Sequence, residues 1–516
     1  MNRKEFLQQL SLLSGGVAFG MGGTSVKAFA HNPFAVDMEA TNGKILVLVQ
    51  LAGGNDGLNT VIPYESSVYY NKRASIAVKK ENVLALNSQM GLNPGMTAMK
   101  ELYDSGKMTI VQNVGYASPN RSHFRSTDIW LTGSDANEMI DEGWAGRYLT
   151  KLYPGFPIQI PEQPMAIQLG SVESLLIQTD LGSTGVVFSN PTNFYNLVTG
   201  TMVDNEPVPD TLAGEELKFM RQIATQSVAY SDIIKKKWDG VSKNVSPYPT
   251  TNLSNQLKIV GELIGGGLQT PIYLTTIGGF DTHANQVVAN ATNTGTHTNL
   301  LKTVSDAVAA FQKDLEKRGL ADKVVVMTFS EFGRRVTQNG TMGTDHGSAA
   351  PLFVIGSGVR GGLLGKNPNL NDLDGNGDIK FEYDFRQVYT SILQDHLGVE
   401  AQVARDIMGN KDFTGLPIFK IATSTLLASN QDFTFDVNAA NPFITYTSVA
   451  YSLKKQMNVK IALYDMVGRE ISILRQGHLA AGVYSEFIEG TRLVPGHYLC
   501  AMQCDAGQKV VRIVRA

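Results

Sequence analysis

Acidic, imidazole, hydroxyl and guanidinium side chains gather in five short segments of this sequence, and each segment offers a group that can bind a metal or an anion. Hard divalent cations prefer oxygen ligands, and zinc accepts carboxylate and imidazole together. The sequence therefore predicts a centre for one or two divalent ions, with zinc, calcium and magnesium all left open. The candidate ligands are Asp56, Asp281, His283, Glu331, Asp345 and His346.

Three further side chains complete the predicted chemistry. Two metal ions about 3.5–4 Å apart would polarise an ester oxygen and lower the pKa of the Ser122 hydroxyl or of a water molecule. Arg125 or Arg334 would then hold a tetrahedral oxyanion through paired N–H donors. These groups together predict ester hydrolysis, either by attack of Ser122 or by attack of an activated water.

Short apolar runs precede these segments and predict the elements that position them. Such runs are typical of buried parallel strands, and helical periodicity is found between them, at 253–268 and 301–315. This order predicts an α/β domain with a mostly parallel sheet and helices on both faces, in which ligands bind at the carboxyl ends of the strands. We therefore expect the candidate residues to share one cavity. The strands are expected at 45–51, 108–114, 272–276, 323–329 and 352–355.

Each motif also has a purely structural interpretation. Gly-Gly-Asn-Asp-Gly at 53–57 is often a tight turn, Asp281 and His283 can be a hydrogen-bonded loop pair, and Asp345-His346 can be a salt-linked turn. The functional interpretation depends on the joint placement of the motifs at successive strand ends. The sequence has no G-x-S-x-G elbow and no P-loop, which argues against a common serine esterase and a nucleotide hydrolase.

The same segments resemble the bacterial family known as domain of unknown function 1501, over roughly residues 40–420. That family is similar to the alkaline phosphatase and sulfatase superfamily. The likeness implies that Asp56 and Glu331 face one metal, that Asp281, His283 and His346 face the other, and that Ser122 is the nucleophile. The motifs that carry it are VQLAGGNDGLN at 49–59, RSH at 121–123, GFDTH at 279–283, TFSEFGR at 328–334, GTDHG at 343–347 and DFRQVY at 384–389.

The sequence departs from well-studied phosphatases at two places. Its Asp-x-His spacing at 281–283 is shorter than their Asp-x-x-x-His, and Ser330-Glu331-Phe332 stands where many have Asp-His. Two alternatives to a phosphatase or sulfatase therefore stay open. One is a non-catalytic surface protein that keeps the fold as a binding or assembly module, and the other is hydrolysis of a peptidoglycan or polysaccharide modification.

The first thirty residues have the three parts of a secretory signal. A basic start at 2–4 precedes an apolar run at 6–21 and an Ala-x-Ala site, which predicts cleavage after Ala30. Residues 3–7 resemble the twin-arginine export motif with Lys4 in place of the second arginine. An amphipathic first helix is the alternative. No other segment approaches the roughly 18 apolar residues that span a bilayer, so we expect no transmembrane helix in the mature protein.

The last segment alternates short apolar runs with turn residues and predicts a small antiparallel β-sandwich at 441–516. Asn441-Pro442-Phe443, 459–465, Gly468-Arg469 and Gly496-His497-Tyr498 resemble the C-terminal sorting domain of type IX secretion cargo. The resemblance implies the type IX secretion machinery as a partner and delivery through the periplasm to the cell surface or medium. A carbohydrate-binding or immunoglobulin-like module is the alternative.

Composition sets the remaining limits. The 516 residues suggest several units: a signal at 1–30, an α/β domain at 31–425 with a helical insertion near 200–250, a linker at 426–440 and the sandwich. A net charge of −3 leaves no electrostatic footprint for nucleic acid. Two cysteines exclude a Cys-based zinc site. The leading hypothesis is an exported metal-dependent hydrolase of a phosphate or sulfate ester on a small molecule or glycan.

Overall fold

A computed structural model of the protein describes residues 43–157, 159–199, 211–420, 432–437, 442–444, 446–465 and 469–515. The predicted signal at 1–30 lies outside the described residues. The chain forms two compact units, the larger mainly from residues 36–149 and 162–420 and the smaller mainly from residues 421–516. Within the described ranges, no helix combines the length and the apolar character needed to cross a membrane.

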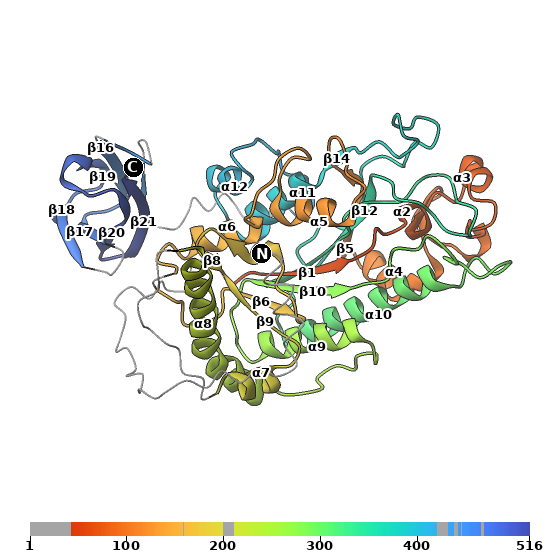
Figure 1. Ribbon diagram of the computed structural model, residues 1–516, viewed down its shortest axis with the longest axis horizontal. Coiled ribbons are helices and arrows are strands. Elements are labelled where there is room, and N and C mark those ends of the chain that lie inside the picture. Colours follow the sequence, from red (N-terminus) through yellow and green to blue (C-terminus); the bar gives the residue numbers. More distant parts are fainter. Residues whose placement is uncertain are drawn as a thin grey trace. The chain divides into compact units, whose positions relative to one another are not determined.

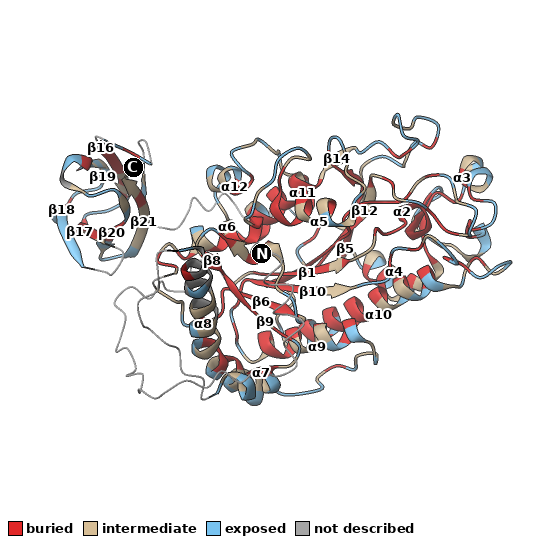
Figure 2. Ribbon diagram, viewed as in Figure 1, coloured by how far each residue is buried: buried red, intermediate tan, exposed pale blue. Residues whose placement is uncertain are grey.

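A nine-stranded sheet forms the centre of the larger unit, and helices cover both of its faces (Figure 1). The strands β1, β5 and β11 are buried along their whole length or nearly so, and much of the central sheet is red in Figure 2. The α/β prediction with a mostly parallel sheet is therefore confirmed. The strand order is β13 (Gly362–Leu364), β5 (Met108–Gly115), β12 (Ala350–Ile355), β11 (Val324–Phe329), β1 (Ile45–Leu51), β10 (Ile272–Ile277), β6 (Ala166–Leu169) and β9 (Gly185–Phe188), with β14 (Tyr383–Asp384) beside β5.

One strand differs from the expectation. β12 pairs antiparallel with both β11 and β5, whereas the sequence predicted a parallel strand there. The strands β1, β10 and β11 are parallel to one another, so their carboxyl ends lie at one edge. Because β12 runs the opposite way, its amino end lies at that same edge. The loop before β12 therefore meets the loops that follow β1, β10 and β11.

Amphipathic helices pack on this sheet. The predicted periodicity at 301–315 lies within α10 (Thr296–Lys317), where Leu301, Val304 and Phe311 are buried. The periodicity at 253–268 corresponds to α9 (Asn252–Gly265), and α8 (Leu212–Gly240) lies within the expected helical insertion. The other elements of this part are α2 (Gly57–Thr60), α3 (Ser67–Lys72), α4 (Thr97–Asp104), α5 (His123–Thr132), α6 (Trp144–Leu152), α7 (Pro191–Val198), α11 (Phe385–Ser391), α12 (Ala401–Ile407), β2 (Val61–Ile62), β3 (Leu84–Ala85), β4 (Gly91–Leu92), β7 (Gln178–Thr179) and β8 (Gly182–Ser183).

The smaller unit consists of two antiparallel sheets, as predicted for a β-sandwich. Their inner faces share one core, to which Phe435, Tyr451, Ile461 and Cys500 belong. β15 lies in the segment expected as a linker, so the sandwich extends into it. Both cysteines are free. One sheet contains β15 (Phe433–Val437), β16 (Tyr446–Leu453) and β19 (Gly482–Glu489), and the other contains β18 (Glu470–Leu479), β17 (Met457–Asp465), β20 (Gly496–Cys504) and β21 (Gly507–Arg515).

Candidate metal centre

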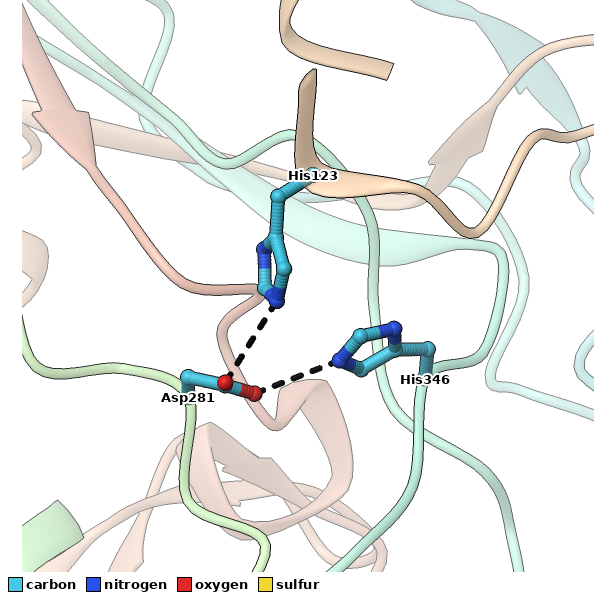
Figure 3. Close-up of side chains that lie close together, drawn as sticks. All are labelled: His123, Asp281 and His346. Carbon is cyan, nitrogen blue, oxygen red and sulfur yellow. Dashed lines mark hydrogen bonds and ion pairs between the residues drawn. The ribbon is translucent and has the colours of Figure 1, made fainter. Parts of the chain in front are cut away.

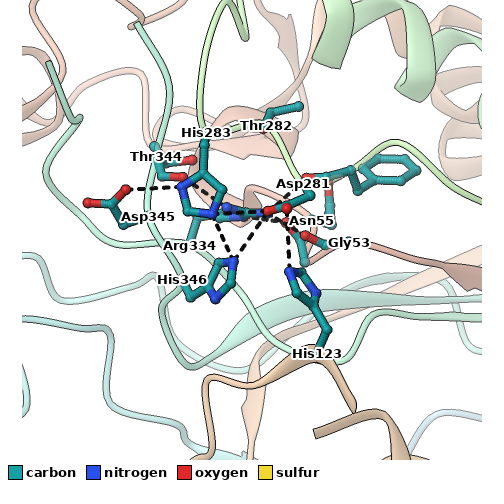
Figure 4. A network of polar contacts seen from close by, with 12 residues as sticks. Gly53, Asn55, His123, Asp281, Thr282, His283, Arg334, Thr344, Asp345 and His346 are labelled. Atoms are coloured by element: carbon teal, nitrogen blue, oxygen red, sulfur yellow. Dashed lines mark hydrogen bonds and ion pairs between the residues drawn. The ribbon is translucent and has the colours of Figure 1, made fainter. Parts of the chain in front are cut away.

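Four metal-binding side chains meet where the loops at the carboxyl edge of the sheet converge (Figures 3 and 4). Asp281 and His283 follow β10, His346 precedes β12, and His123 is the first residue of α5. Ligand atoms of His123, Asp281 and His346 all lie within 4.8 Å of one another. His283 joins them, because its Nε2 lies 2.9 Å from His346 Nε2 and 3.1 Å from Asp281 Oδ1. The predicted convergence of Asp281, His283 and His346 is thus found.

The three imidazole rings are oriented through their Nδ1 atoms. His346 Nδ1 lies 2.8 Å from the Arg121 carbonyl oxygen, and His123 Nδ1 lies 2.8 Å from Glu331 Oε1. His283 Nδ1 lies 3.1 Å from Asp345 Oδ1. A carbonyl oxygen and a carboxylate only accept hydrogen bonds, so each Nδ1 carries a proton, and in a neutral ring Nε2 then presents a lone pair.

Those lone pairs point at other acceptors. His346 Nε2 lies 3.2 Å from Asp281 Oδ1, and His123 Nε2 lies 3.4 Å from Asp281 Oδ2 on the other side of the carboxylate (Figure 3). Unprotonated nitrogens and a carboxylate at such distances repel one another unless a metal ion or a second ring proton lies between them. Metal-binding histidines commonly donate their other N–H to a carboxylate or a carbonyl, as all three rings do here. The donor set therefore fits a divalent metal such as zinc.

Arg334 lies behind Asp281 and does not face solvent. Its side chain is fully buried, and Nη2 donates to Asp281 Oδ1 at 2.6 Å. Nε donates to the Gly54 carbonyl at 2.7 Å, and Nη1 donates to the Thr344 carbonyl at 2.9 Å. These bonds occupy the guanidinium and correct the expectation that Arg334 holds an oxyanion. Partial burial raises the pKa of Asp281, but the hydrogen bond and the positive charge of Arg334 outweigh it and keep that pKa below its usual value.

Arg125 also has another role. Its Nη2 donates to the backbone carbonyls of Asp135 at 3.1 Å and Ala136 at 3.2 Å, and to that of Glu138. Nη2 thus fixes the loop after α5 and is directed at backbone oxygens. The expectation that Arg125 binds an oxyanion is corrected as well.

Asp56 does not join the centre. It is fully buried, and its Oδ2 accepts hydrogen bonds from Arg73 Nη1 and from Gln286 Nε2, both at 2.6 Å. A buried carboxylate requires such partners, because burial without them is very costly. Burial raises the pKa of Asp56, but Arg73 outweighs it and the pKa lies below its usual value. Its predicted role as a metal ligand is replaced by an internal ion pair.

Glu331 and Asp345 stand behind the centre rather than in it. Glu331 is buried, and its Oε1 accepts from His123 Nδ1 and from the Gly53 backbone N–H, each at 2.8 Å. Asp345 holds His283 in the same way (Figure 4). Both carboxylates were predicted as ligands, and both instead orient a histidine.

Ser122, the predicted nucleophile, is exposed and lies directly before His123. It is the N-cap residue of α5, yet its side chain makes no capping hydrogen bond. Its backbone N–H donates to Asn120 Oδ1 at 2.8 Å. The Ser122 hydroxyl therefore does not cap α5, the helix that begins with His123.

His123 is the member of the centre that the sequence analysis missed. It belongs to the segment that follows β5, and the choice of its neighbour Ser122 as nucleophile left the imidazole without a role. The position of His123 in the sequence could have indicated this role, because it follows a predicted strand, as the other candidate ligands do. Its ring also packs against His346, with centroids 4.5 Å apart.

Glycines allow the loops to approach this closely. A Cβ atom on Gly53, whose φ is 123°, would lie 2.3 Å from the Asp281 backbone nitrogen. A Cβ on Gly343 would lie 2.3 Å from the His283 carbonyl oxygen. Both distances are far shorter than a van der Waals contact. The backbone carrying Asp281 and His283 is therefore reached only because these two positions lack side chains.

One family model matches part of the chain. Residues 270–408 match the model of DUF1501, a family of proteins of unknown function, and this stretch contains Asp281, His283, Glu331 and His346. A search of curated proteins finds no match.

Several solved structures share similarity over most of the chain at low identity. A protein of the alkaline phosphatase superfamily from Vibrio parahaemolyticus is 9% identical, with 94% of this chain and 88% of that chain covered and a TM-score of 0.34. A sulfatase from Pseudoalteromonas sp. is 12% identical, with 95% and 89% covered and a TM-score of 0.32. The lipoteichoic acid synthase LtaP from Listeria monocytogenes is 10% identical, with 92% and 90% covered and a TM-score of 0.29.

Proposed function

We propose that this protein is a metal-dependent hydrolase of phosphate or sulfate esters. The observation that carries the proposal is the convergence of the Nε2 atoms of His123, His283 and His346 on the Asp281 carboxylate. The side chains form two overlapping trios of candidate ligands. Asp281 and His346 belong to both trios, and either His283 or His123 is the third member. This arrangement is compatible with one ion or with two. A bound divalent metal would supply Lewis acidity toward an ester oxygen.

The residues around the ligands prepare the centre for that role. Glu331, Asp345 and the Arg121 carbonyl fix the Nδ1–H tautomers, so the Nε2 lone pairs are directed inward before any ligand arrives. Arg334 keeps Asp281 ionised and holds its carboxylate in place. This arrangement avoids the cost of ordering the ligands at the moment of binding.

Ser122 is the candidate nucleophile, and an activated water is the alternative. The Ser122 side chain makes no capping hydrogen bond to the first turn of α5, and a helix N-terminus favours negative charge. An ester bound between Ser122 and the histidines would place its anionic oxygens near those N–H groups. His123, at the start of the same helix, links this end of α5 to the centre.

The exposure of the centre bears on the substrate. The side chains of Asp281 and His283 remain 47% and 44% exposed. Sites for small molecules usually bury most of the ligand surface. An open centre supports an ester carried on a larger molecule, such as a glycan, although a small ester can also reach it. A peptidoglycan or polysaccharide modification fits the same geometry.

One observation favours a second candidate function, a binding or assembly protein that holds metal without turnover. Among the predicted oxyanion donors, Arg334 directs Nε, Nη1 and Nη2 to the protein itself, and Arg125 directs Nη2 to backbone carbonyls. If no other group stabilises the transition state, the centre would bind metal and ligand only.

Purified mature protein distinguishes the two functions. We expect stoichiometric metal by elemental analysis, together with hydrolysis of aryl phosphates or aryl sulfates that is lost on chelation and restored by metal. Asp281→Ala and His346→Ala should abolish both properties, whereas His478→Ala, an exposed histidine on β18, should leave them intact. Metal binding with no turnover on any ester would favour the binding protein, and absence of metal in the wild type would discard both.

We further propose that residues 1–30 direct export and that residues 441–516 act as a type IX sorting domain. The sequence resemblances support this proposal, and the antiparallel sandwich of the smaller unit is compatible with it. In a host with type IX secretion, deletion of 441–516 should retain the protein in the periplasm, and N-terminal sequencing of the mature protein should begin at His31. Surface delivery of the deleted protein would contradict the sorting role.

A further inference from the structure

Gln286 joins the two loops that carry most of the metal centre. Its side chain is fully buried, and its Oε1 accepts hydrogen bonds from Thr282 Oγ1 and Thr344 Oγ1, both at 3.0 Å. Thr282 lies between Asp281 and His283, and Thr344 directly precedes the Asp345-His346 pair. One amide oxygen therefore contacts the residue between Asp281 and His283 and the residue two positions before His346.

The orientation of that amide is fixed from the other side. Gln286 Nε2 donates to Asp56 Oδ2 at 2.6 Å, and Arg73 Nη1 donates to the same oxygen at 2.6 Å. A carboxylate accepts hydrogen bonds only, so Asp56 requires the amide nitrogen to face it and turns Oε1 toward the threonines. Arg73 also donates to the carbonyls of Val336 and Arg335, which anchors the ion pair to the rest of the unit.

Backbone hydrogen bonds connect the same loops. The Gln286 N–H donates to the Met342 carbonyl at 2.9 Å, and the Thr344 N–H donates to the Thr282 carbonyl at 3.2 Å. These bonds hold the loops side by side. The bifurcated side-chain contact adds a further fixed point next to the ligands.

We propose that Gln286, oriented by Asp56, is a positioning residue that sets the separation of the Asp281-His283 and Asp345-His346 loops and thereby the affinity of the centre for metal. This inference rests on the proposed metal centre. It also gives Asp56, which lies outside the centre, a role in its function: Asp56 orients the amide that aligns the ligands. Partners behind metal ligands typically contribute a factor of about 10–100 in affinity.

The test is a metal titration that does not depend on turnover. Metal-free full-length protein is titrated with Zn²⁺ against a chromogenic chelator, and with Co²⁺ followed by its visible spectrum. In the double variant Thr282→Val/Thr344→Val, which keeps shape but removes both hydroxyls, we expect affinity to fall roughly 10- to 100-fold and the Co²⁺ spectrum to change. Gln286→Met should cause the same loss of metal affinity. The double variant Thr282→Ser/Thr344→Ser keeps both hydroxyls and should have the metal affinity and Co²⁺ spectrum of the wild type.

A matched control separates positioning from general stability. Thr270 is also buried, and its hydroxyl donates to the Pro164 carbonyl at 2.7 Å, before β10 rather than after it. Thr270→Val should lower the melting temperature of the metal-free protein without changing metal affinity. A folded double-valine variant with affinity within twofold of the wild type would overturn the inference, even if Gln286→Met fails to fold. Wild type that binds metal without hydrolysing esters overturns only the proposed hydrolase, and wild type that binds no metal overturns both.

Discussion

The Nε2 atoms of His283 and His346 lie 2.9 Å apart, while the Nδ1 atoms of both rings face oxygen acceptors. When both rings are neutral and carry their proton at Nδ1, no hydrogen bond can form between the two Nε2 atoms. The contact is favourable when a cation accepts both lone pairs. The pair therefore gives the metal centre its physical basis, and the Asp281 carboxylate beside it supplies negative charge.

Removing single ligands should produce a graded loss of metal. His346 belongs to both trios of ligands, whereas His283 and His123 each belong to one. We expect His346→Ala to weaken metal binding more than His283→Ala or His123→Ala, with each loss at least as large as the roughly 10- to 100-fold effect of supporting partners. Competition titration of the three variants measures this order. Equal losses, or a greater loss at His123, would contradict the shared position of His346.

Glu331 should act through His123. Glu331→Ala leaves His123 Nδ1 without its acceptor and the Gly53 N–H without its partner, so the ring can rotate or change tautomer. We expect metal affinity to fall about 10- to 100-fold. Glu331→Gln keeps an acceptor oxygen and should lose less. A direct ligand role for Glu331 would instead make both variants as defective as His346→Ala.

The two predicted oxyanion arginines should differ sharply. Arg334→Lys cannot reproduce the fork that binds Asp281 and the Gly54 and Thr344 carbonyls, and it leaves buried acceptors unsatisfied. We expect a loss of roughly 3–5 kcal/mol in the free energy of unfolding, together with loss of metal. Arg125→Lys affects only the loop at 135–138 and should retain metal binding. Urea unfolding and metal titration of both variants test this difference, and a stable, metal-binding Arg334→Lys protein would refute it.

The sequence predicted the features that depend on neighbouring residues, but it did not predict those that depend on contacts with residues far away in the chain. The apolar runs identified the central strands because burial on both faces leaves a continuous signal, and 45–51 coincides with β1 (Ile45–Leu51). The strand at 352–355 was also found, but its direction depends on pairing with β5 and β11, which no local pattern records. The convergence of the loops followed from the order of strands and helices.

The individual roles in the centre were harder to predict because they depend on distant partners. Asp56 follows β1 as a ligand would, yet Arg73 lies seventeen residues away in the sequence and neutralises it in the interior. Arg334 was predicted to hold an oxyanion, but it is buried because carbonyls from three separate loops surround it. His123 was overlooked because its ligand role requires Glu331, 208 residues later.

Two buried histidines outside the centre should make the protein sensitive to acid. Burial lowers the pKa of His297 and of His396 to about 4, from 6.5 in the unfolded chain. Between these values the unfolded chain binds more protons, so stability is complete above about pH 6.5 and is lost as the pH falls toward 4. Each histidine should contribute on the order of 3 kcal/mol over that window.

Urea unfolding at pH 7 and pH 5 measures the effect. His396 Nε2 donates to the Ile45 carbonyl at 2.9 Å, so His396→Gln can keep a donor while removing the titration. We expect a shallower loss of stability with acid in that variant than in the wild type. The same slope in both proteins would assign the acid sensitivity to other groups.

The most direct measurement of the central claim is anomalous diffraction from crystals of metal-loaded protein, with data collected on both sides of the metal absorption edge. The account predicts at least one anomalous peak bound by Asp281 and His346 together with His283 or His123, and no such peak in crystals of Asp281→Ala. Metal-loaded wild-type crystals with no peak among these side chains, or with the metal bound by Asp56 instead, would contradict it.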